Sequence, residues 1–246
     1  MVLINGRKAH SGDYINSSDL ISILEDDSIK HKPIFEKKLK VLFEDDHLAV
    51  VEKPAGLLTS GNQKATLANC LPFNLKKSEI DNALIRPYPV HRLDYATSGL
   101  MIIAKTNQSI ISLSDKFKNK EIKKTYLAVT IGKMPQRGLI ESDIDNKTAQ
   151  SEYLVKKCIQ SAKFDFINLV EVKPYTGRRH QIRKHLLSIG FPICGDLIYN
   201  QKEKNIKGNG LYLLAQKLQF VHPISNQKMN FETEIPKKFN RLFGIC

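Results

Sequence analysis

The sequence lacks the cysteine and histidine groupings on which disulfide-rich and metal-binding proteins depend. Its cysteines lie far apart and form no CxxC pair, at Cys70, Cys158, Cys194 and Cys246. In a chain of 246 residues they are expected to be reduced thiols rather than a disulfide framework or a zinc site. His180 and His185 are five residues apart, which places them on different faces of a helix and excludes HxxxH ligation. We therefore expect no metal site.

Long apolar runs are also missing. No stretch approaches the roughly 20 apolar residues that span a membrane. The N-terminus has no basic segment followed by an apolar one, the arrangement that a secretory signal would show. These absences predict a cytoplasmic protein with no membrane partner.

The sequence contains no glycine-rich phosphate loop. The letters HRLD at 91–94 are similar to a kinase catalytic loop, but no glycine-rich loop precedes them, and FDFIN at 164–168 lacks the glycine of DFG. Glycoside hydrolysis requires two cooperating carboxylates, and we expect no second carboxylate near the polar loops described below. Neither of these enzyme classes is predicted.

What the chain has in excess is positive charge. Its formal net charge is +13 and its isoelectric point lies near 9.5. Residues 1–37 carry five basic and six acidic side chains, so the excess lies beyond them. Such a charge favours a polyanionic partner, most often nucleic acid and sometimes an anionic membrane surface. A scattered, solvated surface that only keeps the protein in solution is the alternative.

Strand-like segments outnumber helical ones. Strands are expected on both sides of a polar turn within 39–53, and in the segments 123–132, 149–159, 164–174, 211–223 and 228–236. Apolar residues at helical spacing predict helices in 106–120, with an N-cap at Thr106 or Asn107, and in 177–190, with Gly190 as its end. Because the strands are often consecutive, we predict an α+β fold with a mixed, mainly antiparallel sheet and flanking helices.

The first 30 residues differ in character from the rest. An Asn-Gly turn at Asn5-Gly6 indicates two short strands, and residues 28–38 are typical of a linker. We therefore divide the chain into an N-terminal segment with linker, 1–32, and a main domain, 33–246.

Three polar loops beside apolar strands are candidates for function, because a rigid sheet can position such residues. They are EKPAGL at 52–57, HRLDYATSGL at 91–100 and TGRRHQIRKH at 176–185. Each loop alone can also be interpreted without any catalytic function. Asp94 could cap a turn, and the basic run 178–184 could be a solvated helix face.

Taken together, these motifs carry a family resemblance. KPAGL, HRLDYATSGLMIIAKT, KKTYLAV, KPYTGRRHQIRKHL, GDLIYN and HP follow one another over about residues 39–240. In this order the sequence closely resembles the RluA-type RNA pseudouridine synthases. The resemblance implies an isomerase that detaches uracil at its C1′–N1 bond, turns the base and rejoins it through C5. It implies no cofactor and no metal, because the reaction has no net redox change and no group donor.

The resemblance also implies roles for single residues. Asp94 takes the place of the catalytic aspartate, and Arg183 that of the arginine that pairs with it and keeps it ionised. Tyr126 takes the place of the tyrosine that packs on the uracil, with a phenol suited to proton transfer at C5. Ile182 adds apolar pocket wall. Without the resemblance, Tyr126 and Ile182 would be interpreted as ordinary core residues.

The target base lies in a stack, so the enzyme must extrude it. Arg92 takes the place of the inserting arginine, whose planar guanidinium stacks on bases. His91, Thr97 and Arg179 are second candidates for RNA contact or loop bracing. The expected partner is ribosomal or transfer RNA, and a monomer is expected. The alternative function is a catalytically silent RNA-binding or assembly protein on the same fold.

The N-terminal segment resembles the end of an S4 module, through VLINGRKAHSGDYINSSDLISI at 2–23. The helical half that usually carries the basic RNA-binding face of that module is not in the sequence. With its net charge of −1, the segment is not expected to dominate RNA binding.

Overall fold

The computed structural model divides the chain into two compact units, Met1–Ile34 and Phe35–Cys246. It describes residues 2–10, 12–24, 33–200 and 210–244. The division falls two residues after the position chosen from sequence, and much of the predicted linker lies outside the described residues. All predicted site residues belong to the second unit.

The first unit is a small antiparallel sheet in the order β2-β1-β3. Its strands are β1 (Val2–Ile4), β2 (Arg7–Lys8) and β3 (Ile21–Ile23). Positive φ angles of 50° at Asn5 and 79° at Gly6 form the tight turn that joins β1 to β2, as an Asn-Gly pair favours. The turn was predicted correctly, but the expectation of two strands was wrong, since a third pairs with β1.

The second unit is built on one large sheet. Its strands are β4 (Lys40–Glu44), β5 (Leu48–Lys53), β6 (Ala83–Pro89), β7 (Ser98–Thr106), β8 (Lys123–Ile131), β9 (Arg137–Glu141), β10 (Gln150–Ser161), β11 (Asp165–Pro174), β12 (Leu213–Val221) and β13 (Lys228–Glu232). The main path runs β4-β5-β7-β12-β8-β11-β10-β9, with β6 paired to β7 and β13 to β12. Among the strand pairs that the described residues form in this sheet, only β7–β12 is parallel. The α+β prediction with a mixed, mainly antiparallel sheet is confirmed.

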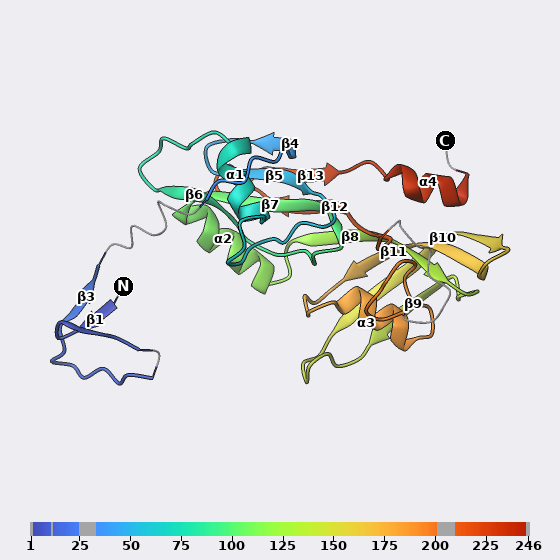
Figure 1. Ribbon diagram of the computed structural model, residues 1–246, viewed down its shortest axis with the longest axis horizontal. Helices are drawn as coiled ribbons and strands as arrows, with labels where there is room; N and C mark the ends of the chain where they lie inside the picture. Colours follow the sequence, from blue (N-terminus) through green and yellow to red (C-terminus); the bar gives the residue numbers. More distant parts are fainter. Residues whose placement is uncertain (1, 11, 25–32, 201–209, 245–246) are drawn as a thin grey trace. The chain divides into compact units, whose positions relative to one another are not determined.

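Helices cover the two halves of this sheet separately. They are α1 (Leu67–Asn74), α2 (Asn107–Lys118), α3 (Gln181–Ser188) and α4 (Lys237–Phe243). In Figure 1, α2 lies against β7, whereas α3 lies beside β11 in the other half. Thr106 caps α2 through a hydrogen bond from the Ser109 amide, as predicted. The predicted helix 177–190 is shorter than expected, because His180 adopts a left-handed conformation (φ 55°) just before α3.

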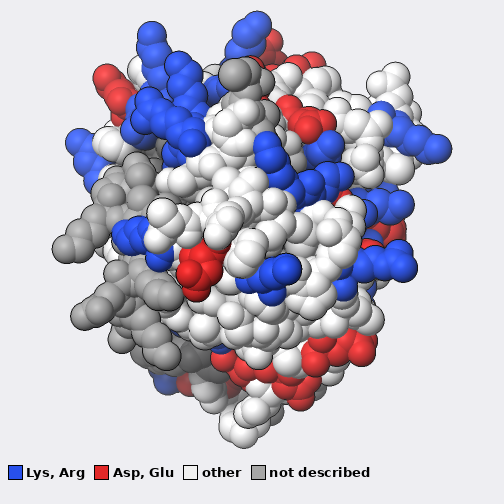
Figure 2. Space-filling model, turned by 90° about the vertical axis from the view of Figure 1, so that its right-hand side faces the viewer, with Lys and Arg blue, Asp and Glu red and all other residues white. Residues whose placement is uncertain are grey.

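The apolar pattern places the core on both halves. Strands β5 and β7 are buried along nearly their whole length, and Leu113 of α2 and Leu186 of α3 are fully buried against their own halves. Figure 2 views the end of the molecule that lies at the right in Figure 1. Lys and Arg gather over the upper part of that face, and Asp and Glu form a band at its lower right. No helix in the described residues is long and apolar enough to cross a membrane.

Gly99 allows the start of β7 to lie directly against β12. Gly99 has a φ of 125°, and a Cβ added there would overlap the backbone of Ala215. This close approach is where β7 meets β12 in parallel, with Ala215 opposite Gly99. Only glycine fits both requirements. The chain that leads into β7, residues 90–97, is therefore held at the junction between the two halves of the sheet.

Candidate active site

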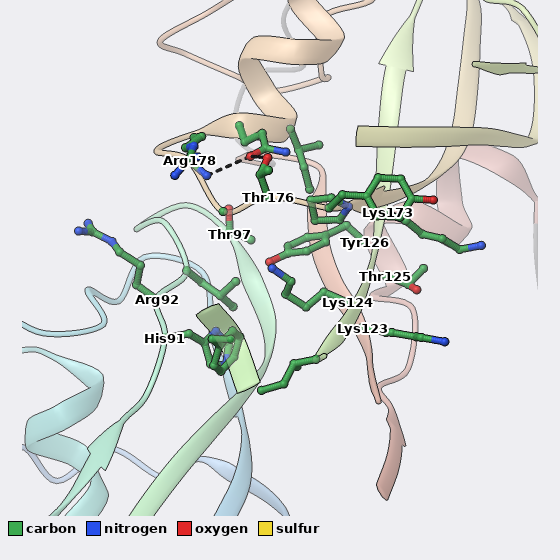
Figure 3. Close-up of a pocket in the computed structure, with 18 of the residues that line it drawn as sticks. His91, Arg92, Thr97, Lys123, Lys124, Thr125, Tyr126, Lys173, Thr176 and Arg178 are labelled. Carbon is green, nitrogen blue, oxygen red and sulfur yellow. Dashed lines mark hydrogen bonds between the residues drawn. The ribbon is translucent and has the colours of Figure 1, made fainter. Parts of the chain in front are cut away.

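A cleft of about 1030 Å³ opens in the second unit where the two halves of the sheet meet. Its walls are the loop 90–97 before β7, the start of β8, the loop 174–180 and the first turn of α3 (Figure 3). The side chains singled out from sequence all line it: His91, Arg92, Asp94, Thr97, Tyr126, Arg179, Ile182 and Arg183. Segments that lie up to 92 positions apart in the sequence thus converge on one cavity.

Asp94 lies in the loop between β6 and β7, with its side chain 19% exposed. The Thr97 amide donates to the Asp94 carbonyl at 3.1 Å and closes a turn. The residue before it, Leu93, is buried, and its amide and carbonyl both bond the buried hydroxyl of Thr59, at 3.2 and 2.9 Å. The carboxylate is therefore presented to the cleft by a loop whose backbone is fixed from behind.

The KPAGL loop does not reach into the cleft but holds the Asp94 loop in place. Lys53 is fully buried, and its ammonium donates to the carbonyls of Pro54 at 2.9 Å, Leu57 at 2.8 Å and Tyr95 at 3.4 Å. Burial lowers the pKa of Lys53 to about 8, with the charge of Asp94 acting in the opposite direction. We interpret Lys53 as a brace between the two loops.

Arg183 is buried in α3 and contacts two carboxylates. Its Nη1 lies 3.7 Å from Asp94 Oδ2, while its Nε and Nη2 donate to Asp196 at 2.7 and 2.8 Å. The predicted neighbour Asp94 is present, but the tighter partner is Asp196, which is 1% exposed. The expectation that no second carboxylate lies near these loops was therefore wrong. It failed because the chain after α3 folds back and brings Asp196 onto the helix.

The Asp196 carboxylate is fixed on both sides. The amides of Ile198 and Tyr199 donate to its Oδ1 at 3.0 Å each. Burial alone would raise the pKa of Asp196, but the hydrogen bonds from Arg183 and from these amides lower it below its ordinary value. The bidentate pair leaves Arg183 one free edge, and that edge faces Asp94.

His180 and Tyr199 complete the surroundings of Asp94, and neither was singled out from sequence. His180 Nε2 lies 3.7 Å from Asp94 Oδ1, and a hydrogen bond of 2.9 Å joins its Nδ1 to the Tyr199 hydroxyl. The Tyr199 ring stacks on the Arg183 guanidinium, 4.9 Å from its Cζ. The letters GDLIYN, already part of the resemblance, were the available signal for Asp196 and Tyr199. Their contacts could not be derived from spacing alone.

Tyr126 enters the cleft from β8. It packs against the cores of both halves of the sheet, and burial and then the charge of Asp94 raise its pKa well above the usual range. Its phenol is therefore protonated and can act as a hydrogen-bond donor. Ile182, 6% exposed, belongs to the core of the second half and also lines the cleft. Ile182 is thus both a core residue and part of the cleft wall.

The remaining predicted residues divide between the surface and the loop interior. Arg92 and Arg179 are exposed at the cleft. Thr97 is buried, and within the described part of the chain its hydroxyl has no hydrogen-bond partner. His91 is a brace: its Nε2 accepts a hydrogen bond of 2.9 Å from the Ile102 amide, and its ring packs on Phe117.

This brace predicts acid sensitivity. Burial first, and then the charge of Lys124, lower the pKa of His91 to about 3, so the unfolded chain binds a proton that the folded protein does not. The contribution of the neutral, buried His91 to the free energy of unfolding is fully present above the ordinary pKa near 6.5 and is lost as pH falls towards 3. The free energy of unfolding should fall by up to about 1.4 kcal/mol per pH unit more in wild type than in His91→Gln, whose amide oxygen still accepts from Ile102.

Urea unfolding at several pH values between about 6 and 4 measures this difference. Parallel pH dependences for wild type and His91→Gln would contradict the brace.

Comparison with known proteins places the chain in a family. The family model described as RNA pseudouridylate synthase matches residues 47–188. An RNA pseudouridine synthase of Aquifex aeolicus, itself uncharacterized, is 32% identical over 99% of this chain and 85% of its own length. Ribosomal large subunit pseudouridine synthase D of Nitrosomonas europaea is 34% identical over 80% of this chain and 62% of its own.

A solved structure, human RNA pseudouridylate synthase domain containing 1, shares the fold. Its TM-score is 0.67 at 22% identity, over 80% of this chain and 83% of its own. The chain therefore belongs to the RNA pseudouridylate synthase family, of the RluA type. It is an isomerase that acts on uridine in RNA, and the family resemblance stated from sequence is confirmed.

Proposed function

We propose that this protein isomerises specific uridines of ribosomal or transfer RNA to pseudouridine, with Asp94 as the catalytic residue and without a cofactor. The observation that carries the proposal is the position of Asp94. Its two carboxylate oxygens each lie 3.7 Å from a different cationic or protonatable group, Arg183 and His180, in the cleft that also holds Tyr126. Location in the cytoplasm and action as a monomer are parts of the same proposal.

The proposed reaction needs no reactant other than the RNA and these side chains. The C1′–N1 bond of uridine breaks, C1′ bonds to C5, the proton leaves C5, and N1 ends protonated, so atoms and electrons balance without a co-reactant. Asp94 acts on the reacting nucleotide, and Arg183 compensates its negative charge in a cleft that is partly closed to water. Tyr126 packs on the uracil and acts in proton transfer at C5.

Access to the base requires flipping. Arg92 is exposed two residues before Asp94, so its guanidinium can enter the stack that the uracil leaves, at a cost of a few kcal/mol for unstacking. Thr97 and His91 keep the loop in shape, Ile182 forms apolar wall, and Arg179 contacts RNA at the rim. We further propose that residues 1–32 are a partial S4-like segment, followed by a catalytic domain at 33–246.

Binding should weaken steeply with salt. The net charge of +13 implies that affinity for RNA arises largely from the release of phosphate counterions, at about 0.7 units of slope per phosphate for a single strand. Filter binding of an unmodified ribosomal RNA fragment at several salt concentrations measures the slope. A constant affinity between low and moderate salt would contradict this use of the charge.

The proposal is tested with unmodified transcripts. Purified protein is incubated with ribosomal RNA and, separately, with transfer RNAs made in vitro, and pseudouridine is counted by mass spectrometry after nuclease digestion. We expect conversion at one or a few positions of one RNA class, and the same yield in excess EDTA when the RNA is folded beforehand. No conversion in either class, with intact RNA binding, would favour the silent RNA-binding protein.

A further inference from the structure

Lys124 occupies a position in the cleft that the proposed chemistry does not use. It precedes Tyr126 by two residues on β8 (Lys123–Ile131), and alternate residues of a strand share a face. Figure 3 shows the side chains of Lys124 and Tyr126 pointing towards the loop that carries His91, Arg92 and Thr97. Those of Lys123 and Thr125 point the other way. The two lysines therefore point in opposite directions although both border the cleft, with Lys124 half-buried and Lys123 exposed.

This lysine is a half-buried cation without an anionic partner. Within residues 33–200 and 210–244, no acidic side chain and no hydrogen-bond acceptor contacts its ammonium, which lies 5.9 Å from the centroid of the Phe117 ring. Burial lowers the pKa of Lys124. The other buried cation of the cleft, Arg183, is held by two carboxylates. A desolvated charge is costly unless it is paired. An anion bound beside Lys124 would therefore be stabilised by its ammonium.

The side chains next to Lys124 cannot neutralise its charge. The Nε2 of His91 already accepts from the Ile102 amide, and the positive charge of Lys124 helps to lower the pKa of His91. Phe117 offers only the face of a ring. An RNA substrate can supply the anion that the described neighbours of Lys124 lack, and in RNA that anion is the phosphate, since uracil is neutral.

We infer that Lys124 binds a phosphodiester oxygen of the RNA strand that enters the cleft. This inference rests on the proposed function and adds the contact that fixes the backbone of the target nucleotide or its neighbour. Two residues along a strand span roughly 7 Å, so Lys124 and Tyr126 extend from neighbouring positions on one face of β8, and the phosphate is bound beside the uracil on which the tyrosine packs. A lysine suits this task, because its ammonium is a compact point charge with three donors.

Lys123 provides a matched control, because it carries the same charge one residue away and also borders the cleft, but its side chain is exposed and points away from the loop 90–97. Binding of a short, labelled, single-stranded oligouridylate is measured by fluorescence anisotropy over a range of salt concentrations. The proteins are wild type, Lys124→Gln, Lys124→Arg and Lys123→Gln. We expect Lys124→Gln to weaken binding about tenfold and to lower the salt slope by about 0.7, the value for one phosphate on a single strand.

Lys124→Arg should keep most of the slope, since its charge still reaches the phosphate, and Lys123→Gln should change it much less. On the transcript that wild type modifies, Lys124→Gln should raise KM more than it lowers kcat. Thermal unfolding checks that each variant is folded. If Lys124→Gln is not folded, the salt slope of Lys124→Arg still tests the inference.

Three results would overturn the inference. The first is an unchanged salt slope in Lys124→Gln. The second is an equal loss of affinity and slope in both glutamine variants, because that would indicate only the overall positive charge of the surface. The third is a loss of activity in Lys124→Gln that is confined to kcat. In each of these cases wild type still binds and modifies RNA, so the proposed function stands. If wild type neither binds the oligonucleotide nor forms pseudouridine in any transcript, the proposed function fails as well.

Discussion

Asp94→Asn should abolish pseudouridine formation and leave RNA affinity close to that of wild type. The substitution keeps the shape of the side chain and removes only the charged carboxylate, while the loop stays fixed through Leu93 and Thr59. Loss of a group that acts on the reacting atoms typically costs on the order of 10⁴-fold or more in turnover. Single-turnover conversion of a modified transcript measures the rate, and filter binding measures the affinity.

The matched control is Asp145→Asn. Asp145 is an exposed aspartate that pairs with Lys184, so the variant makes the same chemical change outside the cleft and should keep turnover. An Asp94→Asn enzyme that forms pseudouridine at a rate near wild type would contradict the role of Asp94.

Arg183→Met should remove activity and also destabilise the protein. Sequence alone predicted an arginine that serves Asp94, but the structure adds the buried pair with Asp196, at 2.7 and 2.8 Å. Removing one member of a buried pair leaves the other charge uncompensated, which typically costs about 3–5 kcal/mol. Urea unfolding should show a loss of that order in the free energy of unfolding, alongside the loss of turnover.

A double variant separates the two roles of Arg183. In Arg183→Met/Asp196→Leu no buried charge is left unpaired, so much of the stability should return, whereas turnover should stay lost because Asp94 still lacks its cation. Turnover restored together with stability would mean that Arg183 acts only as a structural residue. A double variant that stays as unstable as Arg183→Met would contradict the Asp196 pairing as the source of the loss.

The elements that sequence predicts well are those whose pattern is local. Strands such as β8 and β11 follow from runs of β-branched and aromatic residues, and α2 follows from Thr106 as a cap and from apolar spacing. The helix α1 gave no such signal, because it is short and contains Pro72, a residue usually interpreted as a helix break. Strand β6 was missed for a similar reason, with two prolines in its seven residues.

The site divides in the same way. Motif order alone pointed to Asp94, Tyr126 and Arg183, which the fold brings to one cleft. Asp196 and His180 needed the structure, since one contact depends on a loop that returns to α3 and the other on a left-handed residue before that helix. Neither follows from helical periodicity. Lys124 likewise looks the same as Lys123 in the sequence, and only the strand's facing distinguishes them.

The most direct test of the central claim is a comparison of pseudouridine maps of total RNA. The cells carry the wild-type gene, no copy of it, or the Asp94→Asn variant at equal protein level. We predict that one or a few uridines in ribosomal or transfer RNA are modified with wild type and unmodified in both other strains. Identical maps in all three would contradict a pseudouridine synthase that acts through Asp94.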